Sequence, residues 1–224
     1  FLMPQHFNSL IYELSSLCEI DLILDCKGSY DNREWGRNYE ISEENGIIIV
    51  RFTKKTDKRE DQSDGKEEFT LHLAIKSDKK ECTKNNKWVK RHYSLDAERN
   101  SAPYERFVYN SLRLSGTRFV FSISKNRKAA IRECEHVFNN LTEVRNNEKA
   151  HFNAFINSGL FKKILDNGKT GSEIKMAYAN AAYSLNNLIV HGKKNIFAGL
   201  PWFFQFWPRD LLVSLNAISK FNKN

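Results

Sequence analysis

Hydrophobic residues in the first 124 positions come in short runs separated by polar turn residues, a pattern typical of β-strands. The clearest runs lie at residues 20–24, 47–52, 69–75 and 118–123. Between the second and third runs, residues 54–68 contain no hydrophobic side chain but do contain Asp64-Gly65, a hairpin-turn signal. We therefore predict a β-rich region in which residues 54–68 form an exposed hairpin tip.

The hydrophobic period changes to three and four residues after position 125, which predicts helices. Residues 126–157 are expected to form an amphipathic helix that is broken near Asn146-Asn147. A second helix is predicted over residues 172–191, with Ser172 as its N-cap. Its predicted apolar face consists of Ile174, Tyr178, Ala181, Leu185 and Leu188.

A third helix is predicted to begin near Arg209, with an apolar face made by Leu212, Leu215 and Ile218. Strands come first and helices follow, with little alternation between the two. This order predicts an α+β chain, not a parallel α/β sheet, with a boundary near residue 125.

Charge and overall hydrophobicity exclude some classes of protein. The 224 residues carry a net charge of +8, and residues 101–224 carry 18 Lys and Arg against 8 Asp and Glu. The basic residues form no dense tract and no nucleic-acid-binding motif, so we favour a solvated lysine-rich surface and expect no nucleic-acid partner. No apolar run reaches the roughly 18–20 residues of a membrane-spanning helix. With no secretion signal, we expect a cytoplasmic protein with no membrane partner.

Cysteine spacing argues against a metal site. Cys18, Cys26, Cys82 and Cys134 form no Cys-x-x-Cys pair, and the histidines have no paired ligand spacing. We therefore expect free thiols, no metal and no cofactor.

The segment with the most chemical information is residues 198–215, AGLPWFFQFWPRDLLVSL. Five of the six positions from Trp202 to Trp207 are aromatic, and Arg209 and Asp210 follow directly. Aromatic rings can lie on the apolar C–H faces of a sugar, while an adjacent arginine and aspartate supply donors and acceptors for its hydroxyls. These residues are therefore candidates for sugar binding. The alternative is that the aromatic residues are the core of a helix junction, with Asp210 as a first-turn residue.

This segment resembles the signature of the archaeal and bacterial glycogen debranching enzymes, the amylo-α-1,6-glucosidases. In that family an Ala-Gly-x-Pro-Trp-Phe start leads into a Trp-x-Arg-Asp element at the head of a barrel helix. A second segment, GSYDNREWGRNYEI at residues 28–41, resembles the N-terminal β-sandwich domain of the same family. The two segments lie in the order that the family has.

The resemblance implies a multidomain α+β fold, in which an N-terminal β-supersandwich precedes an (α/α)6 barrel. Residues 1–124 would be the β-sandwich domain, residues 125–170 linker helices, and residues 171–224 the first helices of the barrel. The sandwich would be incomplete at its N-terminus and the barrel incomplete at its C-terminus.

By the same resemblance, the complete protein would be a glycoside hydrolase that releases α-1,6-linked glucose from glycogen-like α-glucans with inversion. The substrate-binding residues would be Trp202, Phe203, Trp207, Arg209 and Asp210. Hydrolysis of this kind needs two carboxylates, which we expect beyond residue 224. The catalytic residues are therefore expected outside this chain, and the chain alone is expected to be inactive.

Several alternatives stay open at this stage. A glucoamylase-like or trehalase-like α-glucosidase of the same fold would differ in its substrate. A non-catalytic carbohydrate-binding β-sandwich module would bind glycans without residues 160–224, and a nucleic-acid binder would show salt-sensitive binding to DNA. An incomplete barrel would leave apolar helix faces uncovered, so we also expect association through those faces or disorder near the C-terminus.

Overall fold

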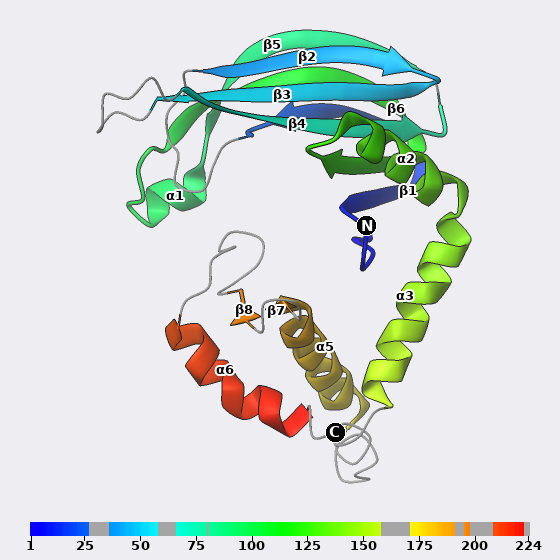
Figure 1. The fold of residues 1–224 in the computed structure, drawn as a ribbon, viewed down its shortest axis with the longest axis vertical. Coiled ribbons are helices and arrows are strands. Elements are labelled where there is room, and N and C mark those ends of the chain that lie inside the picture. Colours follow the sequence, from blue (N-terminus) through cyan, green and yellow to red (C-terminus); the bar gives the residue numbers. More distant parts are fainter. Residues whose placement is uncertain are drawn as a thin grey trace. The chain divides into compact units, whose positions relative to one another are not determined.

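The computed structural model describes residues 1–26, 36–57, 66–79, 81–157, 171–190, 195–197 and 208–221. Within them the chain is a mixed α+β structure dominated by an antiparallel β-sheet (Figure 1). The strands of the sheet are β1 (Ser9–Leu24), β2 (Arg37–Glu44), β3 (Ile47–Asp57), β4 (Lys66–Ser77), β5 (Cys82–His92) and β6 (Glu105–Ser124). The helices are α1 (Ser94–Glu98), α2 (Arg127–Asn139), α3 (Leu141–Ile156), α5 (Ser172–Leu188) and α6 (Pro208–Phe221).

The strands pair in the order β1-β6-β4-β3-β2, and β5 pairs with β6. The four predicted hydrophobic runs lie inside β1, β3, β4 and β6, so these strand predictions are confirmed. The predicted hairpin between β3 and β4 also exists, but its exposed tip is shorter than the predicted residues 54–68. The ladder continues from Lys54 opposite Phe69 to Asp57 opposite Lys66, and Lys54 is fully buried. Residues 58–65, which include Asp64-Gly65, lie outside the described residues.

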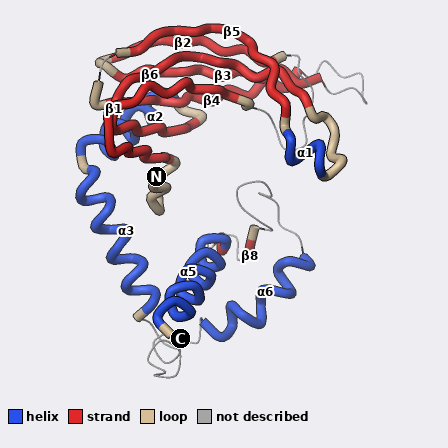
Figure 2. The backbone as a smooth tube through the Cα atoms, turned by 180° about the vertical axis from the view of Figure 1, so that it is seen from behind, coloured by secondary structure: helices blue, strands red, loops and turns tan. Residues whose placement is uncertain are grey.

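The long strand β6 joins two parts of the sheet. Its first half, from Glu105 to Leu114, pairs with β5, and its second half, from Phe119 to Ser124, pairs with β4. Strand β1 runs along both halves. The strands bend along their length (Figure 2), and irregular pairing near Ser111 interrupts both neighbouring ladders. A bulge there turns the strand and lets the two halves share one hydrophobic cluster.

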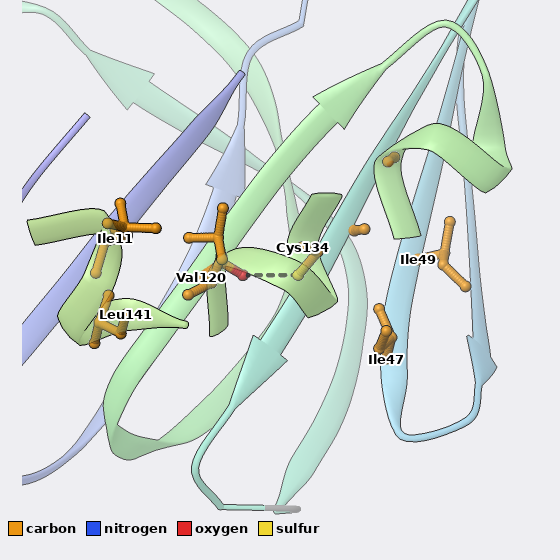
Figure 3. Packing of buried hydrophobic residues seen from close by; sticks show 10 residues of the cluster. Ile11, Ile47, Ile49, Val120, Cys134 and Leu141 are labelled. Atoms are coloured by element: carbon orange, nitrogen blue, oxygen red, sulfur yellow. Dashed lines mark hydrogen bonds between the residues drawn. The ribbon is translucent and has the colours of Figure 1, made fainter. Parts of the chain in front are cut away.

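Hydrophobic residues alternate between the two faces of the sheet, as the period of two residues requires. In β3, Ile47 and Ile49 belong to a cluster that α2 covers. In the same strand Val50 belongs to the opposite cluster, with Leu112 and Phe119 of β6. Figure 3 shows the first cluster, where the Cys134 thiol of α2 donates to the carbonyl oxygen of Val120 at 3.5 Å. Helix α2 therefore completes the core of the sheet. The family resemblance implied that residues 125–170 are linker helices, and this assignment stays a prediction.

The predicted helix over residues 126–157 is two helices, and its break lies at Asn140, not at Asn146-Asn147. Asn126 caps the start of α2 by accepting a hydrogen bond from the Ala129 N–H at 3.0 Å. At the other end, the Asn140 side chain donates to the carbonyl oxygen of His136 at 2.8 Å. The Asn140 backbone N–H also donates to this carbonyl at 3.0 Å, so the side chain and the backbone of Asn140 together cap the last turn of α2.

Helix α5 confirms the predicted second helix, but it ends at Leu188 and not at residue 191, and two further details were wrong. The N-cap is Gly171, and Ser172 is already the first helical residue. The helix buries Ala179 and Ala182 against Phe152, Phe155 and Ile156 of α3. The predicted apolar face is largely exposed to solvent, since Ile174 is 64% and Tyr178 is 39% exposed. Small alanine side chains let the aromatic residues approach, which a hydrophobicity pattern does not reveal.

The third predicted helix is confirmed as α6, which begins at Pro208. Proline suits the first helical position because its nitrogen has no hydrogen to donate. Before α6, the two-residue strands β7 (Ile189–Val190) and β8 (Asn195–Ile196) form a small antiparallel pair.

The chain divides into two compact units, Phe1–Val144 and Arg145–Asn224. The first contains the sheet with α1, α2 and the start of α3, and the second contains the rest of α3 with α5 and α6. The domain limits at residues 124 and 170 derive from the family resemblance and stay a prediction.

Candidate functional site

The predicted sugar-binding residues lie around the first turn of α6. Arg209 is the second residue of this helix, and its side chain is exposed. Asp210 follows it in the same turn, although its side chain lies outside the described part. A negatively charged side chain in the first turn of a helix is stabilised by the helix dipole. Arg209 and Asp210 are therefore held next to each other at a helix start, where one can donate and the other accept hydrogen bonds.

The aromatic candidates Trp202, Phe203 and Trp207 lie outside the described residues. The structure therefore places Arg209 and the backbone of Asp210, while the stacking role of the three rings remains a sequence prediction.

A second group of functional interest lies in the sheet and was not found by sequence reasoning. Tyr39 of β2 stacks on Tyr109 of β6, with ring centroids 4.4 Å apart and planes 7° from parallel. Trp88 of β5 meets Tyr39 edge-on at 5.7 Å and lies 5.4 Å from Tyr109. The Arg37 guanidinium lies over the Trp88 ring, 4.8 Å from its centroid. Aromatic rings from three strands thus form one cluster with a cation against it.

Ion pairs hold the polar side of this aromatic cluster. The Arg37 side chain is 4% exposed, lies 3.3 Å from an Asp25 carboxylate oxygen, and donates to the carbonyl oxygen of Phe107 at 2.8 Å. Arg106 lies 3.9 Å from the other Asp25 oxygen and 3.5 Å from Asp96 of α1. Asp25 therefore bridges two arginines, and the end of β1 is tied to the beginning of β2 and to β6.

The protonation states of Tyr39 and Cys26 indicate that this aromatic cluster has a structural role. Burial raises the pKa of the Tyr39 phenol well above its usual range, and burial also raises the pKa of the Cys26 thiol. The Cys26 backbone N–H donates to the Tyr39 hydroxyl oxygen at 3.2 Å. Both groups therefore stay protonated at neutral pH, so neither is an activated nucleophile or a general base.

Two residues of this aromatic cluster lie in a segment that the sequence analysis had singled out. Arg37 and Tyr39 belong to the Trp-Gly-Arg-Asn-Tyr part of residues 28–41, which resembles the family's sandwich domain. Residues 28–35 of that region lie outside the described residues. Trp88 and Tyr109 are 21 residues apart in the sequence and lie opposite each other on β5 and β6, and no local pattern indicates this pairing.

Comparison of the chain with models of protein families, with curated proteins and with solved structures gives no match. Among the described residues, no group of three or more His, Cys, Asp or Glu side chains is placed to hold a metal ion. The four cysteines, all in described segments, are free thiols. None of the described helices is long and apolar enough to cross a membrane.

Proposed function

We propose that this chain is part of a glycoside hydrolase similar to the glycogen debranching enzymes, and that residues 198–215 contact the α-glucan. In this proposal the curved sheet belongs to a β-supersandwich, and α5 and α6 are the first two helices of an (α/α)6 barrel. Arg209 and Asp210 hold hydroxyls of the terminal glucose, and Trp202, Phe203 and Trp207 supply apolar surfaces for its ring.

One observation carries the proposal: α6 begins at Pro208, so Arg209 and Asp210 occupy its first turn directly after the aromatic run. The exposed Arg209 side chain is accessible to a ligand. Fixed donors beside aromatic rings are the combination that recognition of a pyranose requires, because its hydroxyls and its C–H face need different partners.

The proposal assigns glucan binding to this chain but no catalytic acid or base. Hydrolysis with inversion needs a protonated carboxyl to assist the leaving group and a carboxylate to activate water on the opposite side of the sugar. We therefore expect the 224-residue chain to bind α-glucan without releasing glucose.

The test is native gel electrophoresis of the chain in gels with and without glycogen limit dextrin. We expect the wild-type chain to be retarded, and Arg209→Ala and Trp207→Ala each to reduce the retardation at least about fivefold, which corresponds to the loss of roughly 1 kcal/mol of binding. Arg132→Ala is the matched control, since Arg132 is an exposed arginine of α2.

Retardation that is unchanged in both variants would contradict the assignment of the binding residues. Glucose release from limit dextrin by the 224-residue chain would contradict the view that its catalytic pair lies elsewhere. Competition by maltooligosaccharides, trehalose and branched dextrin would separate a debranching-type site from glucoamylase-like and trehalase-like sites.

A further inference from the structure

Two aromatic and two charged residues lie close together on the neighbouring strands β5 and β6, which Figure 1 shows. They are Trp88, Phe107, Lys90 and Glu105, and we call them the block. Trp88 lies opposite Tyr109, and Lys90 lies opposite Phe107. Side chains two residues apart in a strand share a face, so Trp88, Lys90, Phe107 and Glu105 point to the same side of the sheet. Diagonal neighbours of this kind are within reach of aromatic and long side chains.

All four side chains of this block are about half exposed. Trp88 and Phe107 are 43% and 45% exposed, and the side chains of Lys90 and Glu105 are 55% and 51% exposed. Large aromatic residues are usually more buried than this, and here two of them lie together at the surface. The block therefore presents apolar rings to solvent on a rigid part of the fold.

Two neighbouring side chains fix the position of the Trp88 ring. Tyr39 meets it edge-on, and the Arg37 guanidinium lies 4.8 Å from its centroid. Arg37 is itself held by Asp25. A ring fixed in this way loses little conformational entropy when a ligand stacks on it.

The charged half of the block is an ion pair. The Lys90 ammonium lies 2.5 Å from a Glu105 carboxylate oxygen. The hydrogen bond from Lys90 is the main cause that lowers the pKa of Glu105, so the carboxylate stays ionised at neutral pH. The pair therefore offers donors and acceptors side by side next to the two rings, with no net charge of its own.

We propose that Trp88, Phe107, Lys90 and Glu105 form a second carbohydrate-binding surface, separate from Arg209, for a neutral pyranose oligosaccharide. The rings accept the apolar C–H faces of the sugar, and the ion pair exchanges hydrogen bonds with its hydroxyls. The choice of α-glucan as the oligosaccharide rests on the function proposed above, whereas the choice of a pyranose rests on this block alone.

Two features favour a sugar over other ligands. Lys87 and Arg91 are at odd positions of β5, so the alternation puts these cations on the opposite face from Trp88 and Lys90. On the face of the block, Lys90 is paired with Glu105 and Arg37 with Asp25, and His92 lies opposite Glu105. The cations there have carboxylate partners, so this face does not suit a polyanion such as nucleic acid. Four side chains also offer far less than the roughly 800 Å² per partner that a stable protein interface buries.

The test measures binding of maltoheptaose by titration calorimetry and of glycogen by native gel retardation, with the full 224-residue chain. We expect Phe107→Ala to weaken binding about threefold to tenfold, the range that corresponds to losing one aromatic contact. Lys90→Ala combined with Glu105→Ala should have a similar effect. Trp88→Phe retains an aromatic ring for the core and should weaken binding less. Tyr12→Ala removes a 39%-exposed ring from β1 of the same sheet and should change nothing.

The outcomes separate this proposal from the previous one. Weaker binding in the Phe107 variant, with a far-UV circular dichroism spectrum and melting temperature like those of the wild type, supports the second surface even if Arg209→Ala has no effect. Binding that depends on Arg209 and Trp207 but is unchanged in the Phe107 and Lys90/Glu105 variants overturns the second surface and leaves the proposed function intact. Absence of any glycan binding, or binding of DNA in its place, overturns it as well.

Discussion

The two units of the chain bury different kinds of side chain. In Phe1–Val144, the sheet buries large residues completely, among them Phe119, Ile75 and Leu112. In Arg145–Asn224, the buried residues of the described segments are Ala179 and Ala182 of α5 and Ile196 of β8, while hydrophobic side chains of α5 and α6 lie in solvent. These exposed side chains include Ile174 at 64%, Met176 at 56%, Leu212 at 67%, Val213 at 76% and Leu215 at 45%.

This difference has consequences for stability and for function. Removal of apolar surface from water contributes about 25 cal/mol per Å². A unit that buries many large side chains therefore gains much more than one whose described buried residues are two alanines and one isoleucine. The sheet is therefore a rigid support, on which Trp88 and Phe107 are held in fixed positions. The proposed sugar contacts at α6 come from a unit whose described helices leave much of their apolar surface exposed.

The largest expected effect follows from removing a large side chain from the sheet. Phe119 is fully buried and lies in the cluster shared by both halves of β6, with its ring 6.4 Å from that of Phe121. Phe119→Ala should lower the free energy of unfolding by about 3–5 kcal/mol, because it removes buried surface and leaves a cavity. Urea denaturation followed by far-UV circular dichroism measures the change.

The matched variant in the helical unit is Leu212→Ala. Leu212 is 67% exposed, so this change should stay within about 0.5 kcal/mol of the wild type. If both variants lost similar amounts of stability, Leu212 would have to be buried in solution, and the contrast between the units would not hold.

Much of the architecture could be predicted from the sequence because local patterns determine it. Runs of hydrophobic residues between turn signals located β1, β3, β4 and β6, and steps of three and four located α2, α3, α5 and α6. Strands β2 and β5 were not among these runs. The pattern of β5 is weak because most of its residues are exposed and lysines and asparagines dominate it. An edge strand rich in lysine gives little hydrophobic signal.

The rest depends on contacts that are distant in the sequence. The cluster of Tyr39, Trp88 and Tyr109 needs β2 to meet β5 and β6, which no local pattern specifies. The buried face of α5 is set by the aromatic residues of α3 that approach its alanines, so the most hydrophobic face was the wrong choice. The assignment of Arg209 and Asp210 came from a motif, and only its placement at a helix start follows from hydrophobic pattern and proline chemistry.

The second prediction uses two glycines, one in each unit. A Cβ added to Gly116 of β6 would collide with the Ser77 hydroxyl and lie 2.6 Å from an Asp78 carboxylate oxygen. That carboxylate accepts hydrogen bonds from the backbone N–H groups of Thr117 at 2.9 Å and Arg118 at 3.1 Å. Gly116→Ala should therefore cost about 1–3 kcal/mol, since the turn must shift and strain its hydrogen bonds.

Gly171 offers the opposite case, because no atom lies within 4 Å of a Cβ added there. Gly171 is the N-cap of α5 and makes no side-chain cap, so Gly171→Ser should stabilise the helix by a few tenths of a kcal/mol. Thermal unfolding of both variants gives the comparison. A Gly116→Ala protein as stable as the wild type would show that the turn at Asp78 adapts freely, contrary to the rigid sheet described above.

The last prediction tests what holds the helical unit together. The Tyr183 ring of α5 meets Phe152 of α3 at 5.0 Å and 89°, and Phe155 at 5.5 Å and 65°. Edge-to-face pairs contribute about 0.5–1.5 kcal/mol beyond their buried area. Tyr183→Leu keeps an apolar side chain but removes these pairs, so it should lower the free energy of unfolding by an amount in this range. Thermal unfolding followed by the helical circular dichroism signal measures the change. Tyr178→Leu, at a 39%-exposed position of the same helix, should have less effect. Equal effects of the two variants would mean that α5 does not use its alanine face against α3, and the helical unit would then lack the packing that distinguishes Tyr183 from a surface residue.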